Sequence, residues 1–113
     1  MSHTNLVNFM GDYDTLVSIG KRANRLMVVD FFATWCGPCQ SLGAKIPEIA
    51  KAFPDVLFVK VDIDACGELA NKYSVRSVPT IKFMKANDSG LNDLGTVMGP
   101  DVEGIKQKIN SLK

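Results

Sequence analysis

The sequence is poor in histidine, tryptophan and cysteine, and each scarcity excludes a class of protein. Its 113 residues contain one histidine, one tryptophan and three cysteines. An odd cysteine count in a chain with no export signal does not fit a disulfide-stapled scaffold. We therefore expect the cysteines to serve chemistry.

Long apolar runs and an excess of charge are also lacking. The longest apolar run, around residues 26–33, is interrupted by Asp30 and is too short to cross a bilayer. The N-terminus lacks the basic start and apolar stretch of a secretory signal, and Asp12 and Asp14 argue against a mitochondrial presequence. With a formal net charge of +1 and scattered Lys and Arg residues, neither nucleic acid nor a membrane is an expected partner. A cytoplasmic location is expected.

What is present is an ordinary globular composition, with 46% hydrophobic and 22% charged residues. This length suits one domain, residues 1–113, and the sequence contains no repeat, linker or low-complexity segment.

Hydrophobic periodicity predicts alternating strands and helices in the first two thirds of the chain. The expected strands are residues 6–9, 26–33 and 56–63, and the expected helices are residues 13–19, 36–53 and 66–73. Gly20 is expected to end the first helix and Pro47 to kink the second. Asp64 is a candidate N-cap of the third.

The last third of the chain predicts a hairpin and a final helix. Strands are expected over residues 80–84 and 94–98, joined by a loop over residues 86–92. Asp101 is the expected N-cap of an amphipathic helix that ends near Leu112. The order β-α-β-α-β-α-β-β-α predicts an α/β fold, with parallel early strands, an antiparallel late hairpin and helices on both faces of a mixed sheet.

The motif that carries chemistry is Trp35-Cys36-Gly37-Pro38-Cys39, between an apolar strand and a helix. This spacing brings two sulfurs close enough to bond reversibly. It also puts the first sulfur at a helix N-terminus, where unpaired N–H groups and the helix dipole favour an anion. Lowering its pKa below the usual value of about 8.5 makes the thiolate, which is the nucleophile, more available at neutral pH. Proline suits the first helical turn, and glycine removes bulk beside the sulfur.

Half of a zinc site is the alternative for this motif. Zinc needs two further ligands at metal spacing, and only Cys66 and His3 remain. These do not form a second pair, so neither a metal nor another cofactor is expected. His3 is expected to lie in a mobile tail.

The run from Val28 to Cys39 resembles the signature of the thioredoxin family. Further matches follow in order at residues 60–64, residues 77–81 and Gly99, so the resemblance extends from the first helix to the C-terminus. It implies the thioredoxin fold, with a mixed central sheet of about five strands and about four flanking helices. It also implies a protein-disulfide reductase that uses a reversible Cys36–Cys39 disulfide.

The resemblance implies roles for four catalytic residues. Cys36, expected to be exposed, would attack the substrate disulfide, and Cys39, expected to be buried, would resolve the mixed disulfide. Asp30, whose burial in an apolar strand predicts a raised pKa, would assist proton transfer to and from Cys39. Lys60 matches the position of its partner. A carboxylate facing solvent at a strand end is the alternative for Asp30.

The resemblance also implies a substrate-binding surface. Pro79 would be cis, and the backbone at Val78 would pair with an extended substrate segment. The flat apolar surface would consist of Trp35, Gly37, Pro38, Val78, Pro79 and Gly99. For Trp35, partial burial in the core is the alternative.

The implied partners are a flavoprotein thioredoxin reductase and disulfide-containing proteins such as peroxiredoxin or ribonucleotide reductase. The chain would act as a monomer in electron transport and cell redox homeostasis.

An oxidase or isomerase remains open, although those usually carry another dipeptide between the cysteines. A non-catalytic binding subunit remains open too, because fold does not fix function. A glutaredoxin-like role is weaker, since that family typically has Pro-Tyr where this chain has Gly-Pro.

The sequence departs from the family in several places. Ala44 stands where most members have proline and Pro47 follows three residues later, so the helix kink would move or be lost near the site. Residues 86–95 imply an extended hairpin loop, and Phe32 replaces the tryptophan of many bacterial members. Some animal members form a second disulfide from the position of Cys66, but its partner position is Tyr73 here. Cys66 is expected to be an inert, partly buried thiol, with a regulatory or intermolecular role as the alternative.

Overall fold

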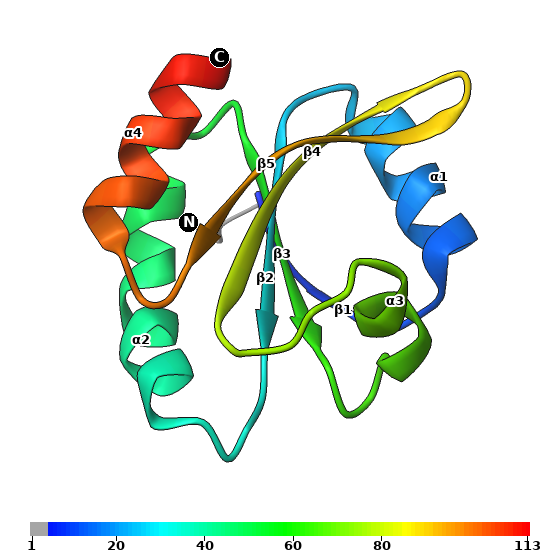
Figure 1. Cartoon of the computed structure of the whole chain (residues 1–113). Helices are drawn as coiled ribbons and strands as arrows, with labels where there is room; N and C mark the ends of the chain where they lie inside the picture. The colour runs from blue at the N-terminus through cyan, green and yellow to red at the C-terminus, as the bar shows by residue number, and fades with distance from the viewer. Residues whose placement is uncertain (1–4) are drawn as a thin grey trace.

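The predicted order of strands and helices is confirmed by a computed structural model, which describes residues 5–113 (Figure 1). The elements are β1 (Leu6–Phe9), α1 (Tyr13–Ala23), β2 (Met27–Phe32), α2 (Gly37–Ala52), β3 (Leu57–Asp62), α3 (Gly67–Lys72), β4 (Thr80–Asn87), β5 (Gly90–Met98) and α4 (Val102–Leu112). His3 lies outside the described residues.

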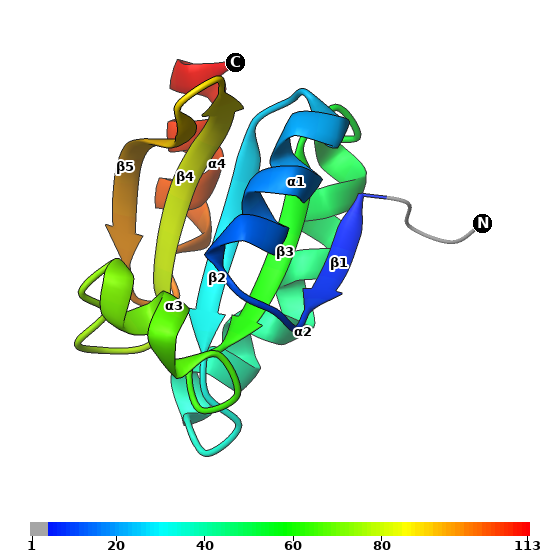
Figure 2. The same cartoon turned by 90° about the vertical axis from the view of Figure 1, so that its right-hand side faces the viewer.

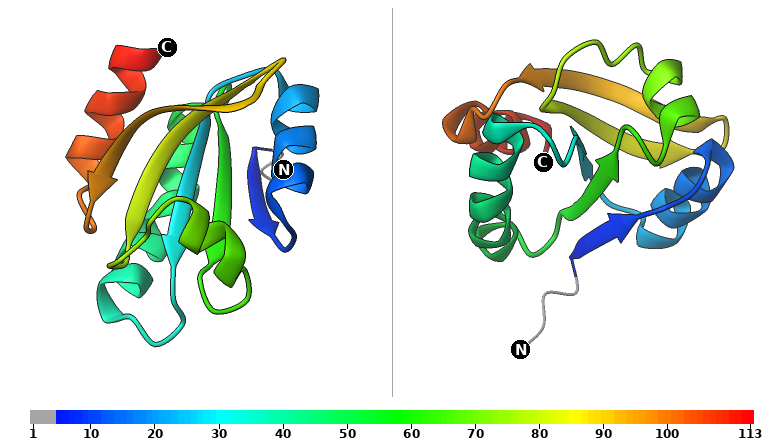
Figure 3. Two further views of the ribbon diagram at one scale, coloured as in Figure 1. Left: turned by 45° about the vertical axis from the view of Figure 1, so that its right-hand side comes forward. Right: turned by 90° about the horizontal axis from the view of Figure 1, so that it is seen from below.

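The five strands form one mixed sheet in the order β1-β3-β2-β4-β5. β3 pairs in parallel with both β1 and β2, while β4 pairs antiparallel with β2 and β5. Helices α2 and α4 cover one face and α1 and α3 cover the other, as Figures 1 and 2 show. The views in Figure 3 agree with this three-layer arrangement. The fold predicted from the resemblance is therefore confirmed.

The central strands β2 and β3 are mostly apolar because both faces of the sheet are covered. Along β2, Val28 packs into the core on the side of α2 and α4, while Val29 and Phe31 pack into the core on the side of α1 and α3. β3 divides its side chains in the same way, with Phe58 on the first side and Val59 on the second. Asp30 and Lys60 follow this alternation onto the α2 side.

Helix α1 continues through Gly20, so the prediction that Gly20 ends it is wrong. Gly20 is needed for packing instead, because a Cβ there would lie 2.9 Å from Met27 Cε and 3.1 Å from Ala86 Cβ. The helix ends at Asn24, which adopts a left-handed conformation with φ of 50° and donates its N–H to Gly20 O.

The predicted loop over residues 86–92 is also wrong. β4 continues to Asn87 and β5 begins at Gly90, so the turn consists of Asp88 and Ser89. The Ser89 N–H donates to Asn87 Oδ1 at 2.8 Å, an Asx interaction that closes the turn. The additional length of this segment therefore extends the ladder rather than a loop, with a register shift between Phe83 and Met84.

Helix α2 runs without interruption through Pro47, and its far end is tied to the N-terminal strand. The buried Asn5 side chain donates through Nδ2 to Ala50 O at 2.8 Å, and to Phe53 O and Val56 O at 3.1 Å each. Backbone carbonyls at the end of a helix have no partner within it, so Asn5 supplies a donor to this end of α2.

The predicted N-cap of α4 is confirmed, whereas the predicted N-cap of α3 is wrong. Asp101 is the N-cap of α4 and accepts from the Gly104 N–H at 2.9 Å, as predicted. Cys66, not Asp64, occupies the N-cap position of α3 and makes no side-chain capping bond. Among residues 5–113, no helix has the length and apolar character of a membrane span.

Candidate active site

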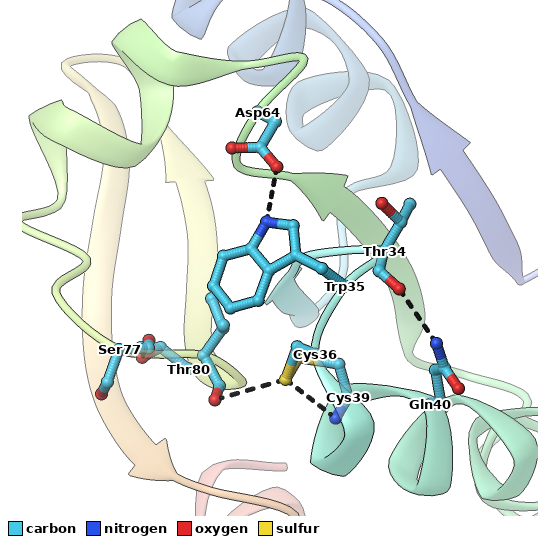
Figure 4. The surroundings of a disulfide bond; sticks show 9 residues. Thr34, Trp35, Cys36, Cys39, Gln40, Asp64, Ser77 and Thr80 are labelled. Carbon is cyan, nitrogen blue, oxygen red and sulfur yellow. Dashed lines mark hydrogen bonds between the residues drawn. A yellow bond between two sulfur atoms is a disulfide. The ribbon is translucent and has the colours of Figure 1, made fainter.

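The two motif cysteines lie where the end of β2 leads into the N-terminus of α2. Cys36 is the N-cap of α2, and its Sγ accepts a hydrogen bond from the Cys39 N–H at 3.1 Å. Cys36 and Cys39 form a disulfide, with their Cα atoms 5.3 Å apart (Figure 4). Because the helix N-terminus supplies an N–H and a favourable dipole, it stabilises negative charge on Cys36 Sγ when the bond is reduced.

The two cysteines hardly differ in overall exposure. The exposed fraction is 6% for Cys36 and 4% for Cys39, so the expectation of an exposed Cys36 is wrong for this disulfide-bonded form. They differ instead in which hollow of the surface each residue lines.

Cys36 lines an open groove of about 460 Å³, which we call the Cys36 groove. Its lining comprises Trp35, Cys36, Gly37, Pro38, Ile63, Val75, Arg76, Ser77 and Val78. Trp35 is 68% exposed, and its Nε1–H donates to Asp64 Oδ2 at 2.9 Å. This excludes the alternative of core burial for Trp35. A Cβ on Gly37 would meet no atom within 4 Å, so glycine keeps the surface low beside the sulfur.

The loop before β4 forms the opposite wall of this groove. The Val78–Pro79 peptide bond is cis, as the resemblance implied, and Val78 O lies 3.6 Å from Cys36 Sγ. Pro79 O accepts a hydrogen bond from the Gly99 N–H at 2.9 Å, which brings the end of β5 beside the proline. Gly99 has a φ of 80°, a left-handed conformation that glycine adopts readily.

Four of the six predicted substrate-binding residues line the Cys36 groove, whereas Pro79 and Gly99 lie next to it. Residue-level reasoning missed Ile63, Val75, Arg76 and Ser77, which complete the lining. Ile63 and Ser77 belong to the matched segments at residues 60–64 and 77–81, and Val75 and Arg76 directly precede the second segment, which was the available signal.

Cys39 lines a separate hollow of about 480 Å³ on the other side, which we call the Cys39 pocket. Its lining comprises Phe32, Ala33, Thr34, Cys39, Gln40, Gly43, Ala44 and Lys60. Gln40 Nε2 donates to Thr34 O at 2.9 Å, and Figure 4 places this pair on the opposite side of the disulfide from Ser77 and Thr80. Ala44, which replaces the usual proline, thus borders this pocket.

Asp30 and Lys60 are neighbours on adjacent strands, since the β2–β3 register pairs them directly. Asp30 is 2% exposed, and neither carboxylate oxygen has a hydrogen-bond partner among residues 5–113. Burial raises the pKa of Asp30 from 3.8 to about 6, and the positive charge of Lys60 opposes this rise. The alternative of a solvent-facing carboxylate is therefore wrong, and the predicted burial is confirmed.

Lys60 extends from β3 toward α2. Its Nζ lies 4.7 Å from the centroid of the Phe32 ring and would be 3.5 Å from a Cβ on Gly43. A cation over an aromatic face is a favourable contact, so the Phe32 ring favours this position of the ammonium in the lining of the Cys39 pocket.

Cys66 is a free thiol, 5% exposed, in the core on the α3 side of the sheet. The Tyr73 ring lies 6.1 Å from that of Phe31, so this position contributes an aromatic contact rather than a second cysteine. The predicted burial of Cys66 is confirmed. Within residues 5–113, no group of three or more His, Cys, Asp or Glu residues is arranged to hold a metal ion.

The arrangement has the components needed for thiol–disulfide exchange. One sulfur lies at a helix N-terminus in an open groove, and a second is covalently bonded to it one turn inside the helix. A buried carboxyl group, Asp30, whose pKa is raised to about 6 lies on β2, the strand that leads into α2. Such a pair can accept and release two electrons by making and breaking one sulfur–sulfur bond.

Comparisons with known proteins agree with this chemistry. The family model described as Thioredoxin matches residues 7–111. A thioredoxin of Geodia cydonium is 40% identical over 111 residues, which cover 96% of this chain and 100% of the relative. The structure of Trichomonas vaginalis thioredoxin is 44% identical with a TM-score of 0.90, and the match covers 99% of this chain and 100% of that one. A further similar structure comes from a study of thiol resolution in yeast mitochondrial 1-Cys peroxiredoxin via glutathione/thioredoxin systems. It is 28% identical with a TM-score of 0.80, covering 98% of this chain and 99% of that one.

Proposed function

This chain belongs to the thioredoxin family, and from that premise we propose that it is a general reductant of protein disulfides that takes its electrons from a flavoprotein reductase. It is a thiol–disulfide oxidoreductase whose redox-active pair is Cys36 and Cys39. The observation that carries the proposal is the position of Cys36, which caps α2 in an open groove while Cys39 is bonded to it.

In the reaction, the Cys36 thiolate attacks one sulfur of the substrate disulfide and releases the other as a thiolate. Cys39 then attacks Cys36 Sγ, which frees the reduced substrate and restores the Cys36–Cys39 disulfide. The hydrogen bond from the Cys39 N–H at 3.1 Å stabilises Cys36 Sγ as the attacking thiolate. Two electrons pass from the dithiol to the substrate in each cycle.

Asp30 is the proposed proton acceptor and donor for Cys39. A carboxyl group whose pKa is raised to about 6 is largely ionised at neutral pH but can still be protonated transiently. Lys60 is the electrostatic partner of Asp30, because its positive charge keeps the pKa of the Asp30 carboxyl from rising further. Burial without a hydrogen-bond partner leaves both carboxylate oxygens available to accept the proton.

The substrate segment is proposed to lie in the Cys36 groove in extended form, alongside Val78. Recognition through main-chain atoms and a flat apolar surface tolerates many sequences, which suits a general reductant. Trp35 and Pro38 supply apolar area on one side of Cys36, and the cis Val78–Pro79 peptide supplies the wall on the other.

The partners and setting are proposed on the same basis. A flavoprotein thioredoxin reductase would supply the electrons, and peroxiredoxin or ribonucleotide reductase would be typical substrates. The peroxiredoxin named with the yeast neighbour supports the first of these substrates. We place the chain in the cytoplasm as a monomer that takes part in electron transport.

Insulin reduction tests the proposal. The chain with a reductant should accelerate insulin precipitation, and Cys36→Ser should abolish the acceleration because no sulfur remains to attack. Cys66→Ala is the matched control, since that buried thiol lies outside the disulfide, and it should retain activity. Equal activity of wild type and Cys36→Ser would refute the proposal.

The redox potential separates a reductase from an oxidase or isomerase. The dithiol–disulfide equilibrium should be measured against glutathione at defined ratios of its two forms. A reductase requires that ordinary glutathione ratios leave the Cys36–Cys39 disulfide intact. Its reduction under those conditions would favour the oxidase or isomerase.

A further inference from the structure

Met98 is a large apolar side chain that is left exposed at the edge of the sheet where the cysteines lie. Its exposed fraction is 58%, whereas Met27 and Met84 are fully buried in the core. It is the last residue of β5, and β5 runs in the same direction as β2 because β4 is antiparallel to both (Figure 1). The end of β5 therefore lies at the same edge of the sheet as the start of α2.

Two contacts place Met98 beside the wall of the Cys36 groove. The β4–β5 register pairs it with Thr80, the residue that follows the cis proline. The next residue, Gly99, donates its N–H to Pro79 O at 2.9 Å. A protein substrate that lies against Val78 and extends across the start of β4 would therefore also cover Met98.

The sulfur of Met98 lies close to a hydroxyl group that helps to hold this wall. Thr80 Oγ1 is 3.7 Å from Met98 Sδ, and it donates to Ser77 O at 2.6 Å. Because a hydroxyl has one proton and the shorter bond uses it, the thioether keeps its lone pairs free. A sulfoxide oxygen on this sulfur would be a stronger acceptor and would compete with Ser77 O for that proton. Ser77 lines the Cys36 groove, so its position matters for the substrate.

We propose that Met98 is an oxidation site, at which a hydroperoxide converts the thioether to a sulfoxide and thereby weakens the docking of protein substrates. The proposal rests on the reductase function proposed above and adds a means of regulating it. In the reaction with hydrogen peroxide, Sδ forms a bond to one peroxide oxygen, the O–O bond breaks, and the other oxygen leaves as water. The sulfur loses two electrons and the peroxide gains them, while the Cys36–Cys39 pair takes no part.

The sulfoxide changes an apolar contact into a polar one. A substrate that covers Met98 must remove water from the sulfoxide oxygen, which costs free energy unless the substrate supplies a hydrogen-bond donor at that point. A general reductant meets segments of many sequences, so a matching donor is not built into the contact. The second-order rate constant for a protein disulfide should fall about tenfold, which is the typical effect of one buried polar group without a partner.

The experiment oxidises the disulfide form, in which Cys36 and Cys39 are bonded to each other, in a parent chain whose free thiol is removed by Cys66→Ala. The parent chain is treated with hydrogen peroxide, freed from it and reduced with dithiothreitol, which is then removed. Peptide mapping by mass spectrometry locates the sulfoxide. Single-turnover reduction of insulin, measured as free insulin chains in quenched samples, gives the rate constant. Each protein is compared with its own untreated sample.

Peroxide should slow insulin reduction by the parent chain about tenfold. It should leave the rate with 2-hydroxyethyl disulfide unchanged, because this small disulfide can reach Cys36 without covering Met98. Methionine sulfoxide reductases A and B, supplied with dithiothreitol, should restore the rate with insulin, since the two enzymes together reduce both epimers of the sulfoxide.

Met10 offers a matched control for Met98. It is 74% exposed but follows β1, which is the edge strand at the opposite end of the sheet from β5. Met10→Leu should lose activity on peroxide treatment as the parent chain does. Met98→Leu has no sulfur at this position, so its rate with insulin should not change on treatment.

Four outcomes would overturn the proposal. Met98 could carry no sulfoxide, the oxidised parent chain could reduce insulin at the untreated rate, peroxide could slow Met98→Leu as much as the parent chain, or it could slow the small disulfide as much as insulin. The third result would place the effect at another residue, and the fourth would place it at the cysteines. The untreated chain tests the proposed function separately. If it reduces insulin and the oxidised chain does so equally well, the oxidation site is refuted and the proposed function stands.

Discussion

The ionisation of Asp30 should make the wild-type protein lose stability as the pH rises, and Asp30→Asn should remove that loss. The unfolded chain releases this proton near the usual pKa of 3.8, whereas burial raises the pKa in the folded protein to about 6. Between these values the folded state holds a proton that the unfolded state has lost. Stability is therefore highest below 3.8 and is lost as the pH rises through about 6.

The size of the effect follows from the two pKa values. The difference between 3.8 and about 6 corresponds to about 3 kcal/mol of unfolding free energy, most of which is lost between about pH 4 and pH 8. Asp30→Asn has a similar shape but no proton to release. Relative to wild type, the variant should therefore gain about 2 to 3 kcal/mol over this range. The free-energy cost of burying the amide side chain of the variant is the same at the low and the high end of this pH range. It therefore cancels when the change in unfolding free energy across the range is compared.

Urea unfolding of the disulfide form, followed by far-ultraviolet circular dichroism, measures this quantity. Both proteins are unfolded at several pH values, and the difference in unfolding free energy is plotted against pH. Other ionisable groups are common to both proteins and largely cancel in the difference. A difference that changes by less than about 1 kcal/mol, or that falls as the pH rises, would refute the assigned environment of Asp30.

Two further predictions concern residues that the structure places in new roles. Asn5→Ala should lower the unfolding free energy by about 2 kcal/mol in urea, because buried carbonyls at the end of α2 lose their side-chain donor. A loss below about 0.5 kcal/mol would mean that these bonds contribute little. Lys60→Gln should raise the pKa of Asp30 above about 6, since Lys60 now opposes the effect of burial. Carbon-13 NMR of the Asp30 carboxyl measures this, and an unchanged or lower pKa would contradict it.

The sequence predicted well wherever a local pattern coincided with burial. The apolar run around Asp30 is found as β2, with both faces covered by helices. Its carboxyl group is buried with a raised pKa, as its apolar neighbours indicated. Cys36 and Cys39 are bonded, as their spacing at a helix N-terminus predicted. These features depend on residues close together in the chain.

The predictions that failed depended on residues far apart in the chain. Gly20 was interpreted as a helix stop, but it is small because Met27 and Ala86 pack against it. Residues 86–92 have the composition that is typical of a loop, yet the pairing of β5 with β4 holds most of them in strands. Asp64 was predicted to cap α3, but that helix begins at Gly67 with Cys66 at its N-cap, and the Asp64 carboxylate accepts the Trp35 indole N–H. For Gly20 and for residues 86–92, a tertiary contact outweighed the local preference.

The amino-acid sequence by itself determined the order of the elements, the paired cysteines and the buried acid, because backbone periodicity and side-chain spacing are local properties. The resemblance implied Lys60 as the partner of Asp30, and the strand register places the two residues side by side. Only the tertiary structure decided that Asn5 holds the end of α2 and that Cys36 and Cys39 line different hollows. These depend on strand register and on which surfaces meet when the layers pack. Contacts between residues 30 or more positions apart are set by the fold as a whole, so no local pattern encodes them.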